Sequence, residues 1–185
     1  MKILLTGATG YVGKRLLPIL VEQGHDIICC VRDKQRFFCP KEFEKNVKVI
    51  EVDFLKKDSL ENIPKNIDAA YYLIHSMSGS ASNYDELERI SAENFVERIN
   101  KTNAKQVIYL SGIVNDQSLS KHLSSRKAVE QVLNTGTFAT TTLRAGIIVG
   151  SGSASFEIIR DLVQKLPIMV TPKWLNTKCQ PIAIA

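Results

Sequence analysis

Three glycines at a three-residue interval stand near the start of the chain, in the run Thr6-Gly7-Ala8-Thr9-Gly10-Tyr11-Val12-Gly13. They follow a short apolar stretch and precede residues with helical periodicity, so they fall where a strand hands over to a helix. There, glycines provide a tight bend, close approach of backbone to a pyrophosphate, and close helix–strand packing. Amide groups at the helix start also favour phosphates. The run therefore predicts a dinucleotide site, and the alternative is a turn that only needs positive φ angles.

The residues after the second apolar run, Ile27–Val31, bear on the choice of dinucleotide. Arg32 ends this run and Asp33 follows it. A guanidinium at this position could bind the 2′-phosphate of NADP in a bidentate manner and stack on adenine. A carboxylate there would instead hydrogen-bond the ribose 2′-hydroxyl of NAD. We therefore favour NADP(H) over NAD(H), and Asp33 keeps NAD(H) open as the alternative.

Two further places could do chemistry. His75 follows the fourth apolar run, at the carboxyl edge of the expected sheet, where ligands of open α/β folds bind. An imidazole there could contact the nicotinamide half of the cofactor or a substrate, and a purely structural histidine is the alternative. Arg144 and the turn Ser151-Gly152-Ser153 could form an acceptor or anion site, although serines before a helix are also ordinary caps.

Strands and helices must alternate to hold these residues. Runs of strand length separate segments with helical spacing, which predicts an α/β fold with a doubly wound parallel sheet, helices on both faces, as in the NAD(P)-binding Rossmann fold. In the helix after the glycines, Pro18 should introduce a kink. The buried stripe of the helix expected over Asn83–Lys101 should include Leu87, Ile90, Phe95 and Ile99. The predicted strands are Lys2–Thr6, Ile27–Val31, Val47–Val52, Ala69–Ile74, Gln106–Leu110 and Ala139–Leu143.

The pattern changes after this set of strands. We expect residues 1–145 to form the dinucleotide-binding domain and residues 146–185 to begin a small, incomplete substrate lobe on it. A helix is expected at about Phe156–Lys165, and Leu166, Pro167, Met169 and Trp174 should line or support the lobe. The apolar ending Gln180–Ala185 has no closing helix, so we expect a truncated chain.

Composition narrows the class of protein. The chain has 185 residues, of which 44% are hydrophobic and 23% charged, enough for one substantial core. The net charge is +5, but the basic residues are scattered, so we expect no nucleic-acid partner. The four cysteines lack metal-ligand spacing, so we expect no metal site and mostly buried free thiols. Without a membrane-length apolar run, we expect a cytoplasmic protein with no membrane partner.

The glycine run resembles that of the atypical and extended short-chain dehydrogenase/reductases, in particular their NmrA-like NAD(P)H-binding branch. The segments Val31-Arg32-Asp33, Glu51-Val52-Asp53 and Ala70–Ser76 carry the similarity further, as does Gly150–Glu157, which is familiar from bacterial members. The resemblance implies that Asp53 lies near the adenine amino group and Phe54 beside its ring. Together with the glycine-run and Arg32 inferences, it implies cofactor contacts from Gly7, Thr9, Gly10, Tyr11, Val12, Gly13, Arg32, Asp53, Phe54, Leu73 and Lys127.

The resemblance also implies a catalytic set, and this chain departs from it. In such reductases a tyrosine moves the proton, a lysine four residues later lowers its pKa, and an upstream serine orients the carbonyl. Ser111 and Lys127 match the serine and the lysine, but Leu123 stands where the tyrosine belongs. His122 is turned about 100° away on a helix and cannot take its direction. The candidate catalytic residues are therefore Ser111, Lys127 and His75.

Three functions remain open from the sequence. The first is an NAD(P)H-dependent oxidoreductase that transfers hydride to an unidentified small acceptor. The second is a non-catalytic NAD(P)H-binding redox sensor or assembly factor, which Leu123 favours. The third, a sugar-nucleotide epimerase or dehydratase, ordinarily needs the missing tyrosine. The expected partners are a dinucleotide, an unknown small-molecule substrate and, through Glu86–Arg98 and Lys121–Glu130, a second copy of the chain.

Overall fold

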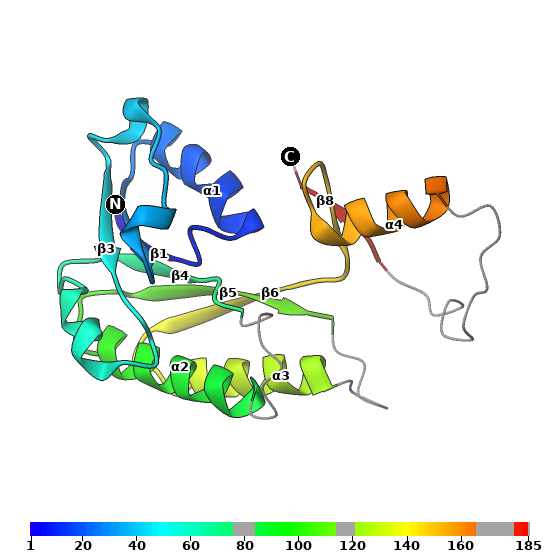
Figure 1. Ribbon diagram of the computed structural model, residues 1–185. Coiled ribbons are helices and arrows are strands. Elements are labelled where there is room, and N and C mark those ends of the chain that lie inside the picture. Colours follow the sequence, from blue (N-terminus) through cyan, green and yellow to red (C-terminus); the bar gives the residue numbers. More distant parts are fainter. Residues whose placement is uncertain (76–83, 114–120, 166–179, 185) are drawn as a thin grey trace. The chain divides into compact units, whose positions relative to one another are not determined.

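A computed structural model describes residues 1–75, 84–113, 121–165 and 180–184 of the chain (Figure 1). It divides into two compact units, residues 1–143 and 144–185. In the part of the chain that is described, no helix combines the length and the apolar character needed to cross a bilayer.

The first unit is built on a six-stranded sheet in the order β3-β2-β1-β4-β5-β6. Neighbouring strands from β3 through β5 pair in parallel. The order reverses between β1 and β4, which makes their carboxyl ends the topological switch point where such sheets bind ligands. The predicted parallel sheet is confirmed. Its strands are β1 (Lys2–Thr6), β2 (Asp26–Val31), β3 (Val47–Glu51), β4 (Ala69–Tyr72), β5 (Gln106–Gly112) and β6 (Ala139–Ala145).

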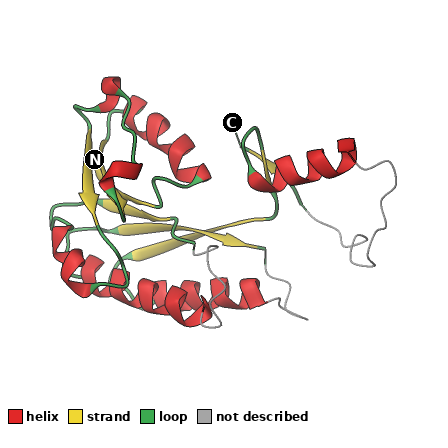
Figure 2. Ribbon diagram, in the orientation of Figure 1, coloured by secondary structure: helices red, strands yellow, loops and turns green. Residues whose placement is uncertain are grey.

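Helices cover both faces of this sheet (Figures 1 and 2). α1 (Tyr11–Glu22) runs through Pro18 and packs on Ile3 and Leu5. α2 (Tyr84–Ile99) and α3 (Lys121–Leu133) lie on the other face, beside Leu4. Alternate residues of β1 therefore enter opposite layers, as a strand buried on both faces requires. Short 3₁₀ helices η1 (Lys34–Arg36), η2 (Lys41–Phe43) and η3 (Lys57–Asn62) complete the unit.

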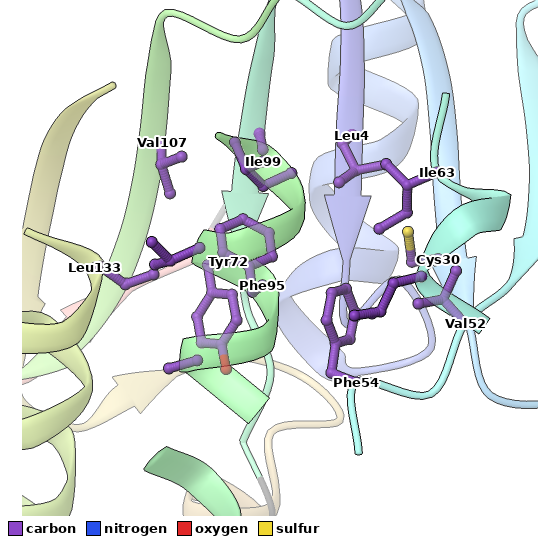
Figure 3. Packing of buried hydrophobic residues seen from close by; sticks show 14 of the residues in the cluster. Leu4, Cys30, Val52, Phe54, Ile63, Tyr72, Phe95, Ile99, Val107 and Leu133 are labelled. Atoms are coloured by element: carbon purple, nitrogen blue, oxygen red, sulfur yellow. The ribbon is translucent and has the colours of Figure 1, made fainter. Parts of the chain in front are cut away.

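The layer under α2 and α3 holds most of the large buried side chains. Tyr72 meets Phe95 with ring centroids 4.7 Å apart, and Tyr109 lies beyond Tyr72 at 6.0 Å. Figure 3 shows this cluster extending to Ile99, Val107 and Leu133. Cys29 and Cys30 are buried free thiols, as expected. The aromatic residues of β4 and β5 thus serve as core, not as site residues.

The buried face of α2 differs from the predicted stripe. Phe95 and Ile99 are buried as expected, but Leu87 and Ile90 are only half-buried. The positions packed inward include Glu88, Ser91 and Ala92 instead. The spacing 88-92-95-99 fits one helical face equally well, but apolar periodicity does not select Glu88, because an isolated buried charge is costly. Glu88 is tolerated there because three other side chains form hydrogen bonds with its carboxylate.

The second unit contains a short parallel pair, β7 (Ile148–Val149) and β8 (Ile182–Ala183), and helix α4 (Ala154–Lys165). Before α4, the Gly152 amide donates to Glu157 Oε1 at 3.1 Å and the Ser153 hydroxyl donates to the Ile148 carbonyl at 2.7 Å. The donors of Gly152 and Ser153 are thus engaged within this unit, which does not favour the predicted anion site at the turn Ser151-Gly152-Ser153. Leu166, Pro167, Met169 and Trp174 lie outside the described residues.

One buried amide links α2 to the loop that follows β3. Asn94 is 6% exposed, and its Nδ2 donates to the Phe54 carbonyl at 2.7 Å. We expect Asn94→Ala to lower the free energy of unfolding by about 2 kcal/mol, because the carbonyl loses this buried partner. Urea unfolding measures this change. Glu93→Ala, at an exposed neighbouring position, is the control, and equal stability of the two variants would contradict the assigned role of Asn94.

Candidate functional site

The glycine turn joins β1 to α1. Gly7 has φ of 65°, whereas Gly10 has φ of −76° and serves as the N-cap of α1. A Cβ on Gly13 would lie only 2.3 Å from the Gly7 carbonyl oxygen, and one on Gly10 would lie 3.1 Å from the same atom. Only Gly7 needs a positive φ angle. The reading as a turn that needs only positive φ therefore fails, since Gly13 leaves no room for a Cβ and Gly10 leaves little.

The turn also lies directly against the end of β4. A Cβ on Gly7 would come within 2.6 Å of the Leu73 carbonyl oxygen. The Thr6 hydroxyl accepts from the Leu73 amide at 3.0 Å and donates to the Tyr71 carbonyl at 2.9 Å. Thr6, which the sequence did not single out, thus ties the carboxyl ends of β1 and β4 together. These two hydrogen bonds fix the position of the backbone at the switch point between the strands.

A pocket of about 180 Å³ opens at this place. Its walls come from the carboxyl end of β2 and from the segments that follow β1, β2, β3 and β4, together with Ser91 of α2. This is the expected position for a ligand of a doubly wound sheet. The lining residues are Gly7, Thr9, Gly10, Cys30, Val31, Arg32, Val52, Asp53, Phe54, Leu55, Leu73, Ile74, His75 and Ser91.

The structure brings most of the expected cofactor residues together here. Tyr11, Val12 and Gly13 lie next to the pocket in the first turn of α1, but they do not line it. No side chain in the described part of the chain caps this helix, and its first turn carries no acidic residue. Its N-terminus thus fits a phosphate. The predicted residues that do line the pocket are Gly7, Thr9, Gly10, Arg32, Asp53, Phe54, Leu73 and His75.

Arg32 and Asp33 have different surroundings. Arg32 is exposed and lines the pocket. Asp33 does not line it, and its Oδ1 accepts from the Gln35 amide at 2.9 Å, which caps η1. Its other oxygen lies 3.6 Å from Nε of Arg36. Asp33 is therefore engaged with its own loop, while the guanidinium is the charged group of the β2 end that lines the pocket.

Asp53 and Phe54 contribute to the pocket in a restricted way. Oδ1 of Asp53 accepts from the Leu55 amide at 3.0 Å, so the carboxylate also shapes its own turn. The Phe54 ring packs in the core, 5.7 Å from Phe95, and the residue is 6% exposed. Only this small exposed part of Phe54 can meet a ligand.

The expected catalytic serine and lysine lie outside the pocket. Ser111 is buried in β5, and Lys127 is exposed on α3. Leu123 reaches the end of β5, where its Cδ2 lies 2.7 Å from the position that a Cβ on Gly112 would take. Leu123, which stands at the expected tyrosine position, thus packs against Gly112 of β5, the residue that follows Ser111.

A polar cluster that the sequence pattern did not predict surrounds His75. His75 Nδ1 lies 2.8 Å from Glu88 Oε1, and the Tyr84 hydroxyl donates to the same oxygen at 2.7 Å. The Ser125 hydroxyl of α3 donates to Glu88 Oε2. The available signal was Glu88 itself, a charge at helical spacing from Ala92.

These contacts set the ionisation of Glu88. Burial acts to raise the pKa of this carboxyl, but the hydrogen bonds from His75, Ser125 and Tyr84 outweigh it and lower the pKa to about 2. Burial and the bond to Glu88 raise the pKa of Tyr84. Glu88 is thus a buried carboxylate and Tyr84 a neutral donor at physiological pH.

The lowered pKa of Glu88 predicts a pH-dependent stability. The unfolded chain binds this proton more readily, so the stabilisation is complete above about pH 4.5 and is lost as the pH falls towards 2. We expect the difference in free energy of unfolding between wild type and Glu88→Gln to change by up to about 3 kcal/mol across this range. Chemical unfolding at several pH values measures it. A difference that stays constant would contradict the assignment.

Comparison with known proteins gives relatives with two kinds of description. The chain is 22% identical over 178 residues to a chloroplastic divinyl chlorophyllide a 8-vinyl-reductase of Arabidopsis thaliana, covering 87% of this chain and 42% of that protein. It is 24% identical over 114 residues to the photosystem II assembly factor Ycf39 of Synechocystis, covering 60% of this chain and 33% of that protein. The chain thus spans less than half the length of these relatives.

Solved structures confirm the fold. The triphenylmethane reductase of Citrobacter, complexed with NADP(H), superposes with a TM-score of 0.66 at 20% identity, over 80% of this chain and 50% of that one. The family model described as NAD(P)H-binding matches residues 7–158, which include the glycine turn and every residue that lines the pocket. The chain belongs to this NAD(P)H-binding family.

Proposed function

We propose that the protein is an NADP(H)-dependent oxidoreductase that reduces a small acceptor. The observation that carries the proposal is the pocket at the switch point, where the glycine turn and Arg32 meet. Two similar proteins, the vinyl-reductase and the triphenylmethane reductase, are named as reductases, and the latter was solved with NADP(H).

The preference for NADP(H) rests on the end of β2. A 2′-phosphate needs a cation, and Arg32 supplies one at the pocket wall. The carboxylate that would serve NAD(H) belongs to Asp33, which caps η1 and pairs with Arg36. This division of roles favours the phosphorylated dinucleotide.

The chain's residues suit the parts of the cofactor in order. The glycine turn and the first amides of α1 would hold the pyrophosphate. Arg32 and Asp53 would face the adenosine end, and Leu73 and His75 the nicotinamide end. The bound nicotinamide would supply a hydride. Ser111 as orienting group and Lys127 as ribose ligand remain predictions from the resemblance, as does a homodimer through α2 and α3.

A specific observation favours a second candidate function. Leu123 places an aliphatic side chain beside Gly112, where related reductases carry their proton donor. A non-catalytic NAD(P)H-binding sensor or assembly factor needs no donor, and one relative is named as an assembly factor. The same leucine ranks a sugar-nucleotide epimerase or dehydratase last.

Oxidation of NADPH by the full-length protein tests the proposal. Carbonyl, quinone and flavin acceptors are offered in turn, and loss of the reduced-nicotinamide absorbance is followed. We expect turnover with at least one acceptor class, and none in Gly7→Ala. Absence of turnover with every acceptor, combined with reductase activity that first emerges in Leu123→Tyr, would overturn the enzyme and support the non-catalytic candidate.

A further inference from the structure

Side chains of α2, themselves bonded to α3, hold His75 in one orientation. His75 follows β4, Glu88 and Tyr84 belong to α2, and Ser125 belongs to α3. The histidine contacts Glu88 Oε1 through Nδ1 at 2.8 Å, and Ser125 occupies the other carboxylate oxygen. The Glu88 carboxylate therefore fixes the imidazole. Glu88 itself belongs to α2 and is bonded to α3 through Ser125.

The donors and acceptors of this cluster fix the tautomer of the ring. Ionised Glu88 can only accept hydrogen bonds, so the partner on His75 must be Nδ1–H. The Tyr84 hydroxyl spends its one proton on Glu88 Oε1 at 2.7 Å, which leaves it no proton for the ring nitrogen 3.1 Å away. The ring's second nitrogen, Nε2, is then the atom that gains or loses a proton.

The side chains of Glu88 and His75 differ in their exposure to solvent. The Glu88 side chain is 5% exposed, whereas the His75 side chain is 23% exposed and lines the pocket. No described residue forms a hydrogen bond with Nε2. The Glu88 carboxylate is thus shielded from solvent, whereas the His75 imidazole faces the pocket in which a ligand would bind. This is the arrangement of a general acid and the group that orients it.

We propose that His75 exchanges the proton in the reaction through Nε2, with Glu88 as its positioning residue, so that the pair replaces the tyrosine whose place Leu123 occupies. The inference rests on the proposed oxidoreductase function. It adds to that function the atom that carries the proton and the carboxylate that fixes it.

The proton step balances with a polarised double bond such as a carbonyl. A nicotinamide bound in the pocket would supply the hydride, and hence both electrons, to the acceptor carbon. Protonated His75 then donates its Nε2 proton to the acceptor oxygen, so that one N–H bond breaks and one O–H bond forms. Neutral His75 regains a proton from solvent. Glu88 keeps its negative charge throughout and accepts the Nδ1–H of the ring.

Nitrogen NMR of the histidine rings tests the tautomer in the cofactor-free, full-length protein. The His75 signals are assigned by their loss in His75→Gln. We expect neutral His75 to carry its proton on Nδ1 in the wild type, and Glu88→Leu to reduce the Nδ1–H fraction, while Glu93→Leu on the exposed face of α2 leaves it unchanged. A wild-type ring with its proton on Nε2 would overturn the proposal even if Glu88→Leu fails to fold.

Kinetics provide the second test and separate this inference from the proposed function. Once an acceptor is turned over, we expect His75→Gln to lower kcat about 100-fold while the Kd for NADPH stays within a factor of about three. His25→Gln, at the opposite end of the sheet, should retain full activity. If the wild type turns over and His75→Gln is equally active, the role of His75 is overturned but the proposed function is not. If the wild type shows no turnover, the proposed oxidoreductase function is overturned, although the NMR result on the ring tautomer would stand.

Discussion

Gly7→Ala is expected to weaken NADPH binding about 100-fold and to lower the free energy of unfolding by about 2–5 kcal/mol. The alanine must adopt φ of 65°, and its Cβ would lie 2.6 Å from the Leu73 carbonyl oxygen. The Leu73 oxygen belongs to the backbone and the Cβ is fixed by the backbone of residue 7, so the clash cannot be relieved by moving a flexible side chain. The glycine turn must shift away from β4, and the backbone amides that would bind the pyrophosphate shift with it.

Gly24→Ala is a matched control for this variant. Gly24 has φ of 79°, but a Cβ there would meet no atom within 4 Å. It should therefore show only the cost of a left-handed alanine, about 1–2 kcal/mol, with NADPH affinity unchanged. Calorimetry and urea unfolding of both variants measure the two effects. Equal losses of NADPH affinity would show that the approach of Gly7 to Leu73 does not shape the binding site.

Arg32→Ala should weaken NADPH binding by about 10- to 100-fold and leave NADH binding within a factor of about three. A charge-assisted hydrogen bond to a phosphate contributes about 1.5–3 kcal/mol, and only NADPH carries the 2′-phosphate. Parallel titrations with the two nucleotides measure the selectivity. Since Arg32 is exposed, part of this effect should fade at high salt.

Arg36→Ala is the control for Arg32, because it removes an exposed guanidinium that pairs with Asp33 but does not line the pocket. It should leave both affinities unchanged. If Arg32→Ala weakened NADPH and NADH equally, the guanidinium would not be reading the 2′-phosphate. A selective loss of NADH binding in Asp33→Asn would assign the β2 end to NAD instead.

Much of the scaffold follows from local pattern. Runs such as Lys2–Thr6 have the length and apolar character of a strand buried on both faces, and the structure has β1 at those same bounds. The glycine run marks the β1–α1 turn because its spacing reflects backbone packing within a few residues. Residues at the ends of β2 and β4, such as Arg32 and His75, then reach one pocket because parallel strands end at the same edge.

The rest depends on contacts between distant segments. Glu88 is 13 residues from His75 and 37 from Ser125, and nothing local shows that three hydrogen bonds compensate its burial. For the same reason the predicted buried face of α2 included Leu87 and Ile90, whereas the structure buries Glu88 and Ser91. The capping role of Asp33 depends on the path of the loop after β2, which apolar periodicity does not specify.

Titration calorimetry of the full-length protein with NADPH and NADH tests the central claim, that the pocket at the glycine turn is an NADP(H) site. We expect NADPH to bind at least about tenfold more tightly than NADH, since only NADPH gains the Arg32–phosphate contact. We also expect Gly7→Ala to lose this binding while Gly24→Ala retains it. Failure of both nucleotides to bind the folded wild-type protein at millimolar concentration would contradict the account.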